Sequence, residues 1–176
     1  MKITCLRAAM WLGSALLLPL AGHAGKAHEH GAARLDIAYE AGKLSIDLDT
    51  PLDNLLGFER APRTDAERQA ATALVTALKA GDRLFVMDPA ARCTLGKVEL
   101  RSAPLRLGAA DGQGGDHGDL EASWEFSCLG AAPTFVDVDL ATAFKRMNRI
   151  EVQTATPKGQ GKLTLKAPAR RVPLKS

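Results

Sequence analysis

Hydrophobic and polar residues alternate along much of the chain, and this alternation predicts β-strands. Leu35, Ile37 and Tyr39 alternate with polar neighbours, and the same pattern resumes after a turn at Gly42. Residues 33–50 therefore predict a β-hairpin with one face in a hydrophobic core. Further strands are predicted over 84–87, 98–107, 120–128, 134–140, 149–156 and 162–166.

One segment has a helical pattern instead. Thr64 is followed three residues later by Glu67, which is the capping box that begins many helices. The Ala- and Leu-rich run that follows ends near Gly81, a residue typical of helix C-termini. We therefore predict an α+β fold, predominantly antiparallel β with one main helix over about 65–80, as a single disulfide-stapled domain.

Three segments carry turn and loop residues. Residues 51–63 are interpreted as a loop in which Asp53 is a turn or cap residue. Five glycines make 108–119 a loop between two strands. The tail from Pro168 is expected to have little to hold it in place.

The N-terminus predicts export from the cytoplasm. A basic start, an apolar stretch over 8–20 and small residues up to Ala24 form a cleavable signal peptide over 1–24. We expect residues 25–176 to be the mature domain, which works outside the cytoplasm. No later segment approaches the roughly 20 apolar residues that cross a bilayer, so no membrane span is expected.

Charge and motifs exclude two classes of function. Cleavage removes Lys2 and Arg7 and no acidic residue, which lowers the net charge from +3 to +1, and only 5% of residues are aromatic. This composition argues against nucleic-acid binding. The chain also lacks a nucleophile elbow, an HExxH zinc motif and a phosphate-binding glycine loop, so we expect no enzymatic activity.

Two cysteines, Cys93 and Cys128, follow the signal peptide. In an oxidising compartment they are most simply one disulfide, which closes a loop of about 35 residues and contributes about 3 kcal/mol through chain entropy. Two buried free thiols are the alternative. A metal site made from these cysteines is less favoured because they lack a CxxC spacing.

Three histidines remain after cleavage, namely His28, His30 and His117. Imidazole with carboxylate and without thiolate favours Zn²⁺, with Cu²⁺ and Ni²⁺ as chemical competitors. Acidic neighbours complete the candidate ligand set: Glu29, Asp116 and Asp119. A solvated tail and loop without metal is the alternative interpretation.

The hairpin register adds a second argument for a metal ion. A two-residue turn places Asp36 opposite Asp47. Alternate residues of a strand point to the same face, so extending the strand towards the N-terminus puts His28 and His30 on that face too. A cation between these carboxylates would relieve their repulsion. Alternatively, Arg34 and Lys43 neutralise this face without a metal.

The order of these features resembles the ZrgA-type zinc-uptake family of Gram-negative periplasms. It comprises the signal peptide, the His-Glu-His-Gly run at 28–31, the hairpin, the Asn-Leu-Leu-Gly-Phe-Glu run at 54–59, the helix, and two cysteines around a loop with His117. The resemblance implies a zinc-binding accessory protein that supports a zinc ABC importer. It also implies that His28 and His30 match the N-terminal motif and that His117, Asp116 and Asp119 match the central loop.

One residue departs from the family pattern. Arg60 stands where the family usually has histidine after Gly-Phe-Glu, and a guanidinium stays protonated and cannot bind a metal. A single zinc site is therefore expected. The resulting hypothesis is a periplasmic protein that captures Zn²⁺ and supports its delivery to an import system, holding zinc at neutral pH and releasing it near pH 5. The alternative is a metal-independent envelope interaction module stabilised by a disulfide.

Overall fold

The computed structural model describes residues 29–108 and 118–175. The predicted signal peptide, His28, Asp116 and His117 therefore lie outside the described residues. The strands are β1 (Ala32–Glu40), β2 (Lys43–Pro51), β3 (Phe85–Met87), β4 (Cys93–Arg101), β5 (Asp119–Cys128), β6 (Phe135–Val138), β7 (Arg149–Thr156), β8 (Gly159–Lys166) and β9 (Arg171–Pro173). The helices are α1 (Asp53–Leu56), α2 (Asp65–Lys79), α3 (Gly81–Leu84), α4 (Leu140–Ala143) and the 3-10 turn η1 (Pro89–Ala91).

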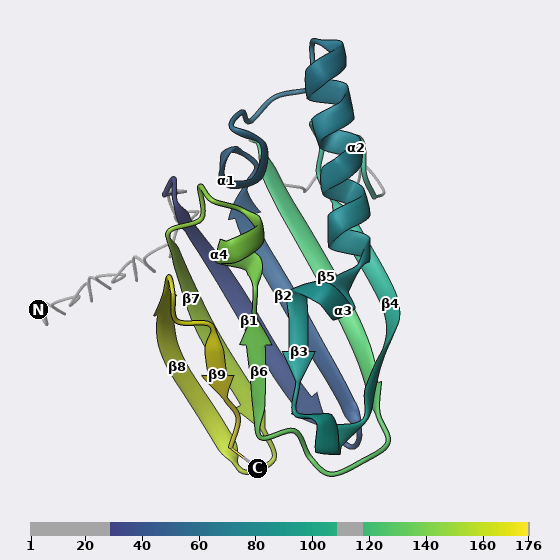
Figure 1. The fold of residues 1–176 in the computed structure, drawn as a ribbon, viewed down its shortest axis with the longest axis vertical. Helices are drawn as coiled ribbons and strands as arrows, with labels where there is room; N and C mark the ends of the chain where they lie inside the picture. Colours follow the sequence, from purple (N-terminus) through teal and green to yellow (C-terminus); the bar gives the residue numbers. More distant parts are fainter. Residues whose placement is uncertain (1–28, 109–117, 176) are drawn as a thin grey trace, which may run out of the picture.

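The strands form two sheets. The larger one has six strands in the order β4-β5-β2-β1-β7-β8, and the smaller one has three in the order β3-β6-β9. Neighbouring strands are antiparallel except for β1 and β7, which are parallel. Figure 1 shows the smaller sheet and α2 against one face of the larger sheet. The predicted α+β fold with one main helix is confirmed.

The core lies between the larger sheet and the layer that covers it. Trp124 on β5 is fully buried, donates its indole N–H to the Leu78 carbonyl at 2.7 Å, and packs edge-on against Phe85. A side chain at Gly81 would collide with this indole ring. As predicted, the main helix α2 ends just before Gly81, with Ala80 as its C-cap, and the glycine also permits the close approach to Trp124.

The capping box of α2 is present as predicted. Thr64 accepts a hydrogen bond from the Glu67 N–H, and the Glu67 carboxylate accepts one from the Thr64 N–H. Arg60 donates two hydrogen bonds to the same carboxylate, at 3.0 and 2.7 Å, and its guanidinium lies over the Phe58 ring. These hydrogen bonds, the one from Arg60 first, lower the pKa of Glu67 to about 2.

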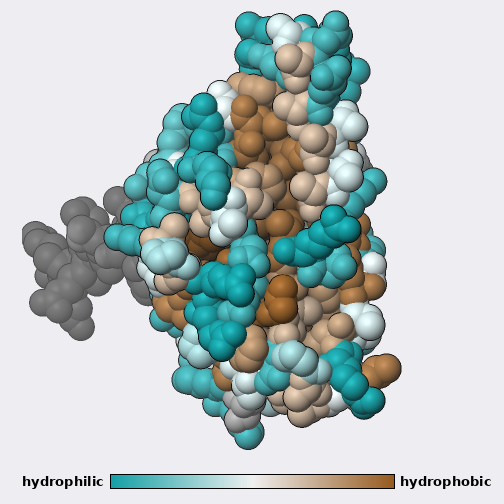
Figure 2. Space-filling model, viewed as in Figure 1, coloured by the Kyte–Doolittle hydropathy of each residue, from teal (hydrophilic) through white to brown (hydrophobic). Residues whose placement is uncertain are grey.

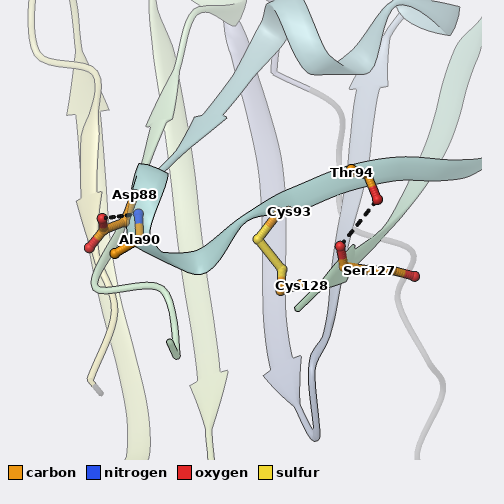
Figure 3. Close-up of a disulfide and its surroundings, with 6 residues drawn as sticks. All are labelled: Asp88, Ala90, Cys93, Thr94, Ser127 and Cys128. Carbon is orange, nitrogen blue, oxygen red and sulfur yellow. Dashed lines mark hydrogen bonds between the residues drawn. A yellow bond between two sulfur atoms is a disulfide. The ribbon is translucent and has the colours of Figure 1, made fainter. Parts of the chain in front are cut away.

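Cys93 and Cys128 form the predicted disulfide. They face each other at the first pair of the β4–β5 ladder, and Cys128 is buried (Figure 3). The bridge therefore fixes the end of β5 that lies beside the β1–β2 turn, where the Cys128 N–H donates to the Gly42 carbonyl.

Three sequence predictions about connecting segments were wrong. The strand predicted over 98–107 is shifted, because β4 begins at Cys93 and the chain then turns between Ser102 and Leu107. The loop 51–63 contains α1. The C-terminal tail is held in place, because Arg171 on β9 donates two 2.8 Å hydrogen bonds to the buried carboxylate of Asp137 on β6.

Candidate functional site

A histidine and two carboxylates meet at the end of the larger sheet where β1 begins. The His30 Nε2 atom lies 3.0 Å from Glu59 Oε1, and its Nδ1 atom lies 4.0 Å from Asp53 Oδ2. The His30 side chain is 65% exposed, whereas that of Asp53 is 21% exposed. The imidazole is therefore accessible to solvent while its position is set by less exposed groups.

Asn54 positions the segment that carries His30. Its buried side chain accepts a 2.6 Å hydrogen bond from the Gly31 N–H and donates to the Ala32 carbonyl and the Thr50 hydroxyl at 2.8 and 2.9 Å. These bonds join α1 to the start of β1 and the end of β2. The residue after His30 is thus fixed to the helical turn that contributes Asp53.

Gly31 changes the direction of the chain next to His30. Its φ of +82° is a left-handed conformation that glycine adopts readily. β1 begins only at Ala32, so His30 precedes the strand and the alternation of the hairpin does not fix its direction. His30 instead contacts Asp53 and Glu59 beside α1.

The outward face of the hairpin is neutralised by protein groups. The predicted pairing of Asp36 with Asp47 is confirmed. Arg34 donates hydrogen bonds of 2.9 and 3.1 Å to Asp36, and Ser123 donates one of 2.6 Å to Asp47. Protein groups thus relieve the repulsion between Asp36 and Asp47 without a metal ion.

Arg146 lies next to the carboxylate of Asp53. Its Nη1 atom lies 3.9 Å from Asp53 Oδ2, and its guanidinium lies beside Gly57, where α1 ends. A cation at the C-terminus of a helical turn and beside a carboxylate is favourably placed. Arg146 therefore balances part of the negative charge of Asp53.

The end of the central loop reaches the same place. The Gly118 carbonyl accepts a hydrogen bond from the Leu52 N–H, and a side chain at Gly118 would collide with Glu59. Asp119, a predicted ligand, follows as the first residue of β5 and is paired with Pro51. The loop end and the N-terminal histidine segment thus meet at α1.

Glu29 is directed to a different partner. Its carboxylate accepts a 2.6 Å hydrogen bond from Arg149, which begins β7 next to β1. The Glu29 carbonyl accepts from the Ala32 N–H, which closes a turn around His30. Glu29 therefore holds the N-terminal segment to β7, and it does not accompany His30 at the pair of carboxylates.

Within the part of the chain that the structure describes, no group of three or more His, Cys, Asp or Glu side chains is arranged to hold a metal ion. Among the described residues, the groups closest to forming a metal site are the His30 imidazole and the Glu59 carboxylate. His28, Asp116 and His117, which the sequence proposes as further ligands, lie outside this part.

Sequence reasoning did not predict Asp53 and Glu59 as partners of His30. Asp53 was interpreted as a turn or cap residue, and it does begin α1. The available signal was the Asn-Leu-Leu-Gly-Phe-Glu run at 54–59, which was recognised as a family motif without roles for its residues. Asn54 and Glu59 within that run are the residues that hold and contact the histidine segment.

Comparison with known proteins identifies a related family. A family model described as ZrgA family zinc uptake protein matches residues 27–174. No curated protein matches the chain. The described helices include none with the length and hydropathy needed to cross a bilayer.

Proposed function

This chain belongs to the ZrgA family of zinc uptake proteins, and from that premise we propose that it is a periplasmic accessory protein that captures Zn²⁺ and supports its delivery to a zinc import system. The proposal is for a binding protein without catalytic activity. Zinc is its cargo, bound through imidazole and carboxylate groups at the His30 end of the larger sheet.

The approach of His30 Nε2 to Glu59 Oε1 carries this proposal. Two ligand atoms bound to a tetrahedral zinc ion lie about 3.4 Å apart, given metal–ligand distances of about 2.1 Å. The observed separation is 3.0 Å. An opening of a few tenths of an ångström would therefore let both groups bind the same Zn²⁺ ion.

Asp53 has a supporting role in this scheme. Histidines that bind metals commonly direct their other ring nitrogen towards a carboxylate, which fixes the orientation of the ring. Asp53 lies on the Nδ1 side of His30, 4.0 Å away, and a small rotation would bring it within hydrogen-bonding distance. Asp53 is thus proposed to orient the imidazole while Nε2 binds the metal.

The remaining ligands are proposed to come from the two flanking segments. His28 precedes His30 by two residues, and His117 directly precedes Gly118 in the chain. Gly118 adjoins Glu59. His28, near His30 in the sequence, and His117, next to Gly118, are therefore candidates to complete a four-coordinate zinc site. Zinc affinity is expected to fall between pH 7 and pH 5, because an imidazole binds zinc only when it is deprotonated.

Isothermal titration calorimetry of the chain from residue 25 with Zn²⁺ tests this function. We expect His30→Ala and Glu59→Gln each to weaken zinc binding at least tenfold. Glu125→Gln, which removes an exposed carboxylate at the other end of β5, is the matched control and should leave the affinity unchanged. A dissociation constant no tighter than millimolar, or equal affinity in all variants, would reject the proposal.

A further inference from the structure

A groove runs along one flank of α2, between the helix and the turn that follows β4. It encloses about 770 Å³. Its apolar lining comes from three segments, the loop before α2, α2 itself and the turn: Pro62, Ala71, Val75, Pro104, Leu105 and Leu107. These side chains are half-buried, so the groove presents apolar surface that a partner could cover.

The charges that line this groove all have one sign. Arg68, Lys79 and Arg106 are its charged lining residues, and no acidic residue is among the described residues that line it. Arg68 pairs with Asp65. For Lys79 and Arg106, no ion pair is found with any described residue. Among the described residues, two cations at the border of this apolar groove therefore have no acidic partner.

The turn that supplies one wall is held in an unusual conformation. Arg106 has a φ of +54°, which residues with side chains rarely adopt. The turn is closed by paired hydrogen bonds between Ser102 and Leu107 and by the bond from the Arg106 N–H to the Ala103 carbonyl at 3.1 Å. Strained backbone of this kind is more common at binding sites than elsewhere.

We propose that this groove is a docking surface for a protein segment that carries hydrophobic side chains flanked by aspartate or glutamate. The apolar lining supplies the contact area, and the cations among its described lining residues select a partner of negative charge. The groove on the other flank of α2 includes Asp65 beside Arg68 and Arg83, so it lacks this single sign. Polybasic membrane-binding segments use four to eight cations, whereas this groove has three and is concave.

Two fluorescein-labelled helical peptides test the proposal by fluorescence anisotropy. Both carry leucines at the same positions on one face, flanked by glutamates in one peptide and by lysines in the other. We expect the chain from residue 25 to bind the glutamate peptide at least tenfold more tightly at low salt. The difference should shrink in about 0.5 M NaCl, where exposed charges are screened.

Variants assign the binding to this groove. Lys79→Glu with Arg106→Glu should reverse the preference between the peptides. Val75→Gln should weaken binding of the glutamate peptide, whereas Ala73→Gln, which changes the other flank of α2, should not. Circular dichroism melting confirms that each variant is folded. None of these variants alters the His30 site. Peptide binding and zinc binding can therefore be tested independently, and either proposal can be rejected without the other.

Several results would overturn the proposal. They are equal affinity for both peptides, no binding at millimolar peptide, or a preference that survives the double charge reversal. A dimer in sedimentation velocity that Val75→Gln abolishes would assign the groove to a second copy of the chain. Cosedimentation with vesicles of three parts phosphatidylcholine to one part phosphatidylglycerol, lost in the charge-reversed variant, would assign it to lipid.

Discussion

Asn54 shows how one buried side chain can place a functional residue. Its amide makes three hydrogen bonds, to Gly31, Ala32 and Thr50, and it is 1% exposed. These partners belong to segments far apart in the sequence. The amide therefore fixes the position of the His30 segment although it makes no described contact with the imidazole itself.

Asn54→Ala should lower the free energy of unfolding by about 3 kcal/mol, since three hydrogen bonds to buried or half-buried groups are lost at about 1 kcal/mol each. It should also weaken zinc binding, because residues 29–32 are no longer held to α1. Urea unfolding and calorimetry measure the two effects. Full zinc affinity in a destabilised Asn54→Ala protein would show that Asn54 does not position the site.

Arg146→Gln should strengthen zinc binding two- to fivefold. The guanidinium lies 3.9 Å from Asp53 and repels an incoming cation, but the pair is partly exposed, so the energy involved is below about 1 kcal/mol. Arg63→Gln, which removes a cation outside the site, is the matched control. A weaker affinity in Arg146→Gln would mean that the cation supports the site and does not compete with zinc.

Local pattern could identify His30 as a candidate ligand but not its partners. Glu59 lies 29 positions further along the chain, and its approach depends on the turn at α1 and on Gly118. An acidic residue at position 53 can begin a helix or orient a metal-binding histidine, so the sequence alone does not distinguish these two roles of Asp53. The left-handed conformation of Gly31 also changes the direction of the chain beside His30. The alternation of hydrophobic and polar residues does not predict this change.

At the scale of elements, the beginning of α2 depends on a charged cluster. Glu67 accepts hydrogen bonds from Arg60, from the Arg63 N–H and from the Thr64 N–H. In this structure Arg60 supports the helix cap. A guanidinium stays protonated and cannot bind a metal, so the described role of Arg60 is structural.

The Glu67 carboxyl should make the stability of the protein depend on pH. Its pKa falls from an ordinary 4.5 to about 2 in the folded state, chiefly through the hydrogen bonds from Arg60. A lowered pKa stabilises the fold above pH 4.5, and this contribution is lost as the pH falls towards 2.

Comparison of the natural chain with Glu67→Gln isolates this contribution. The difference in their free energies of unfolding should be largest near neutral pH and should shrink between pH 4.5 and pH 2. Denaturant unfolding at a series of pH values measures it. A difference that stays constant with pH would contradict the assignment to Glu67.

The elements with strong periodicity were predicted and those set by tertiary contacts were not. The hairpin and α2 follow from alternation and from a capping box, which are local signals. β9 forms only because Val172 packs into the core and Arg171 meets Asp137 on β6. The turn after β4 is likewise fixed by the pair Ser102 and Leu107, which interrupts a run of alternating residues.

At the scale of the whole molecule, the disulfide and the candidate site lie at opposite ends of β5. Cys128 ends the strand that Asp119 begins, and nine residue steps along a strand span about 30 Å. The bridge can therefore stabilise the fold without contacting the site.

Replacing both cysteines, Cys93→Ser with Cys128→Ser, should lower the free energy of unfolding by about 3 kcal/mol. Zinc affinity at neutral pH should be unchanged as long as the variant is folded. Urea unfolding and calorimetry on the same samples check both expectations. A large loss of zinc affinity in a folded variant would show that the bridge and the site are coupled.

The arrangement of strands was the least predictable level. Sequence pattern predicted most of the strands and the antiparallel majority, but not the parallel pairing of β1 with β7. That pairing places Arg149 beside the start of β1, where it binds Glu29. The family assignment, by contrast, was available from the order of motifs, because motif order does not require knowledge of the pairing.

Diffraction at the zinc absorption edge, from crystals of the zinc-loaded chain that begins at residue 25, tests the central claim most directly. We expect an anomalous peak bonded to His30 Nε2 and to a Glu59 oxygen, about 2.1 Å from each. Asp53 should face the other ring nitrogen. A peak at another location with none at His30, or no peak in crystals grown with excess zinc, would contradict the claim that this end of the sheet binds the metal.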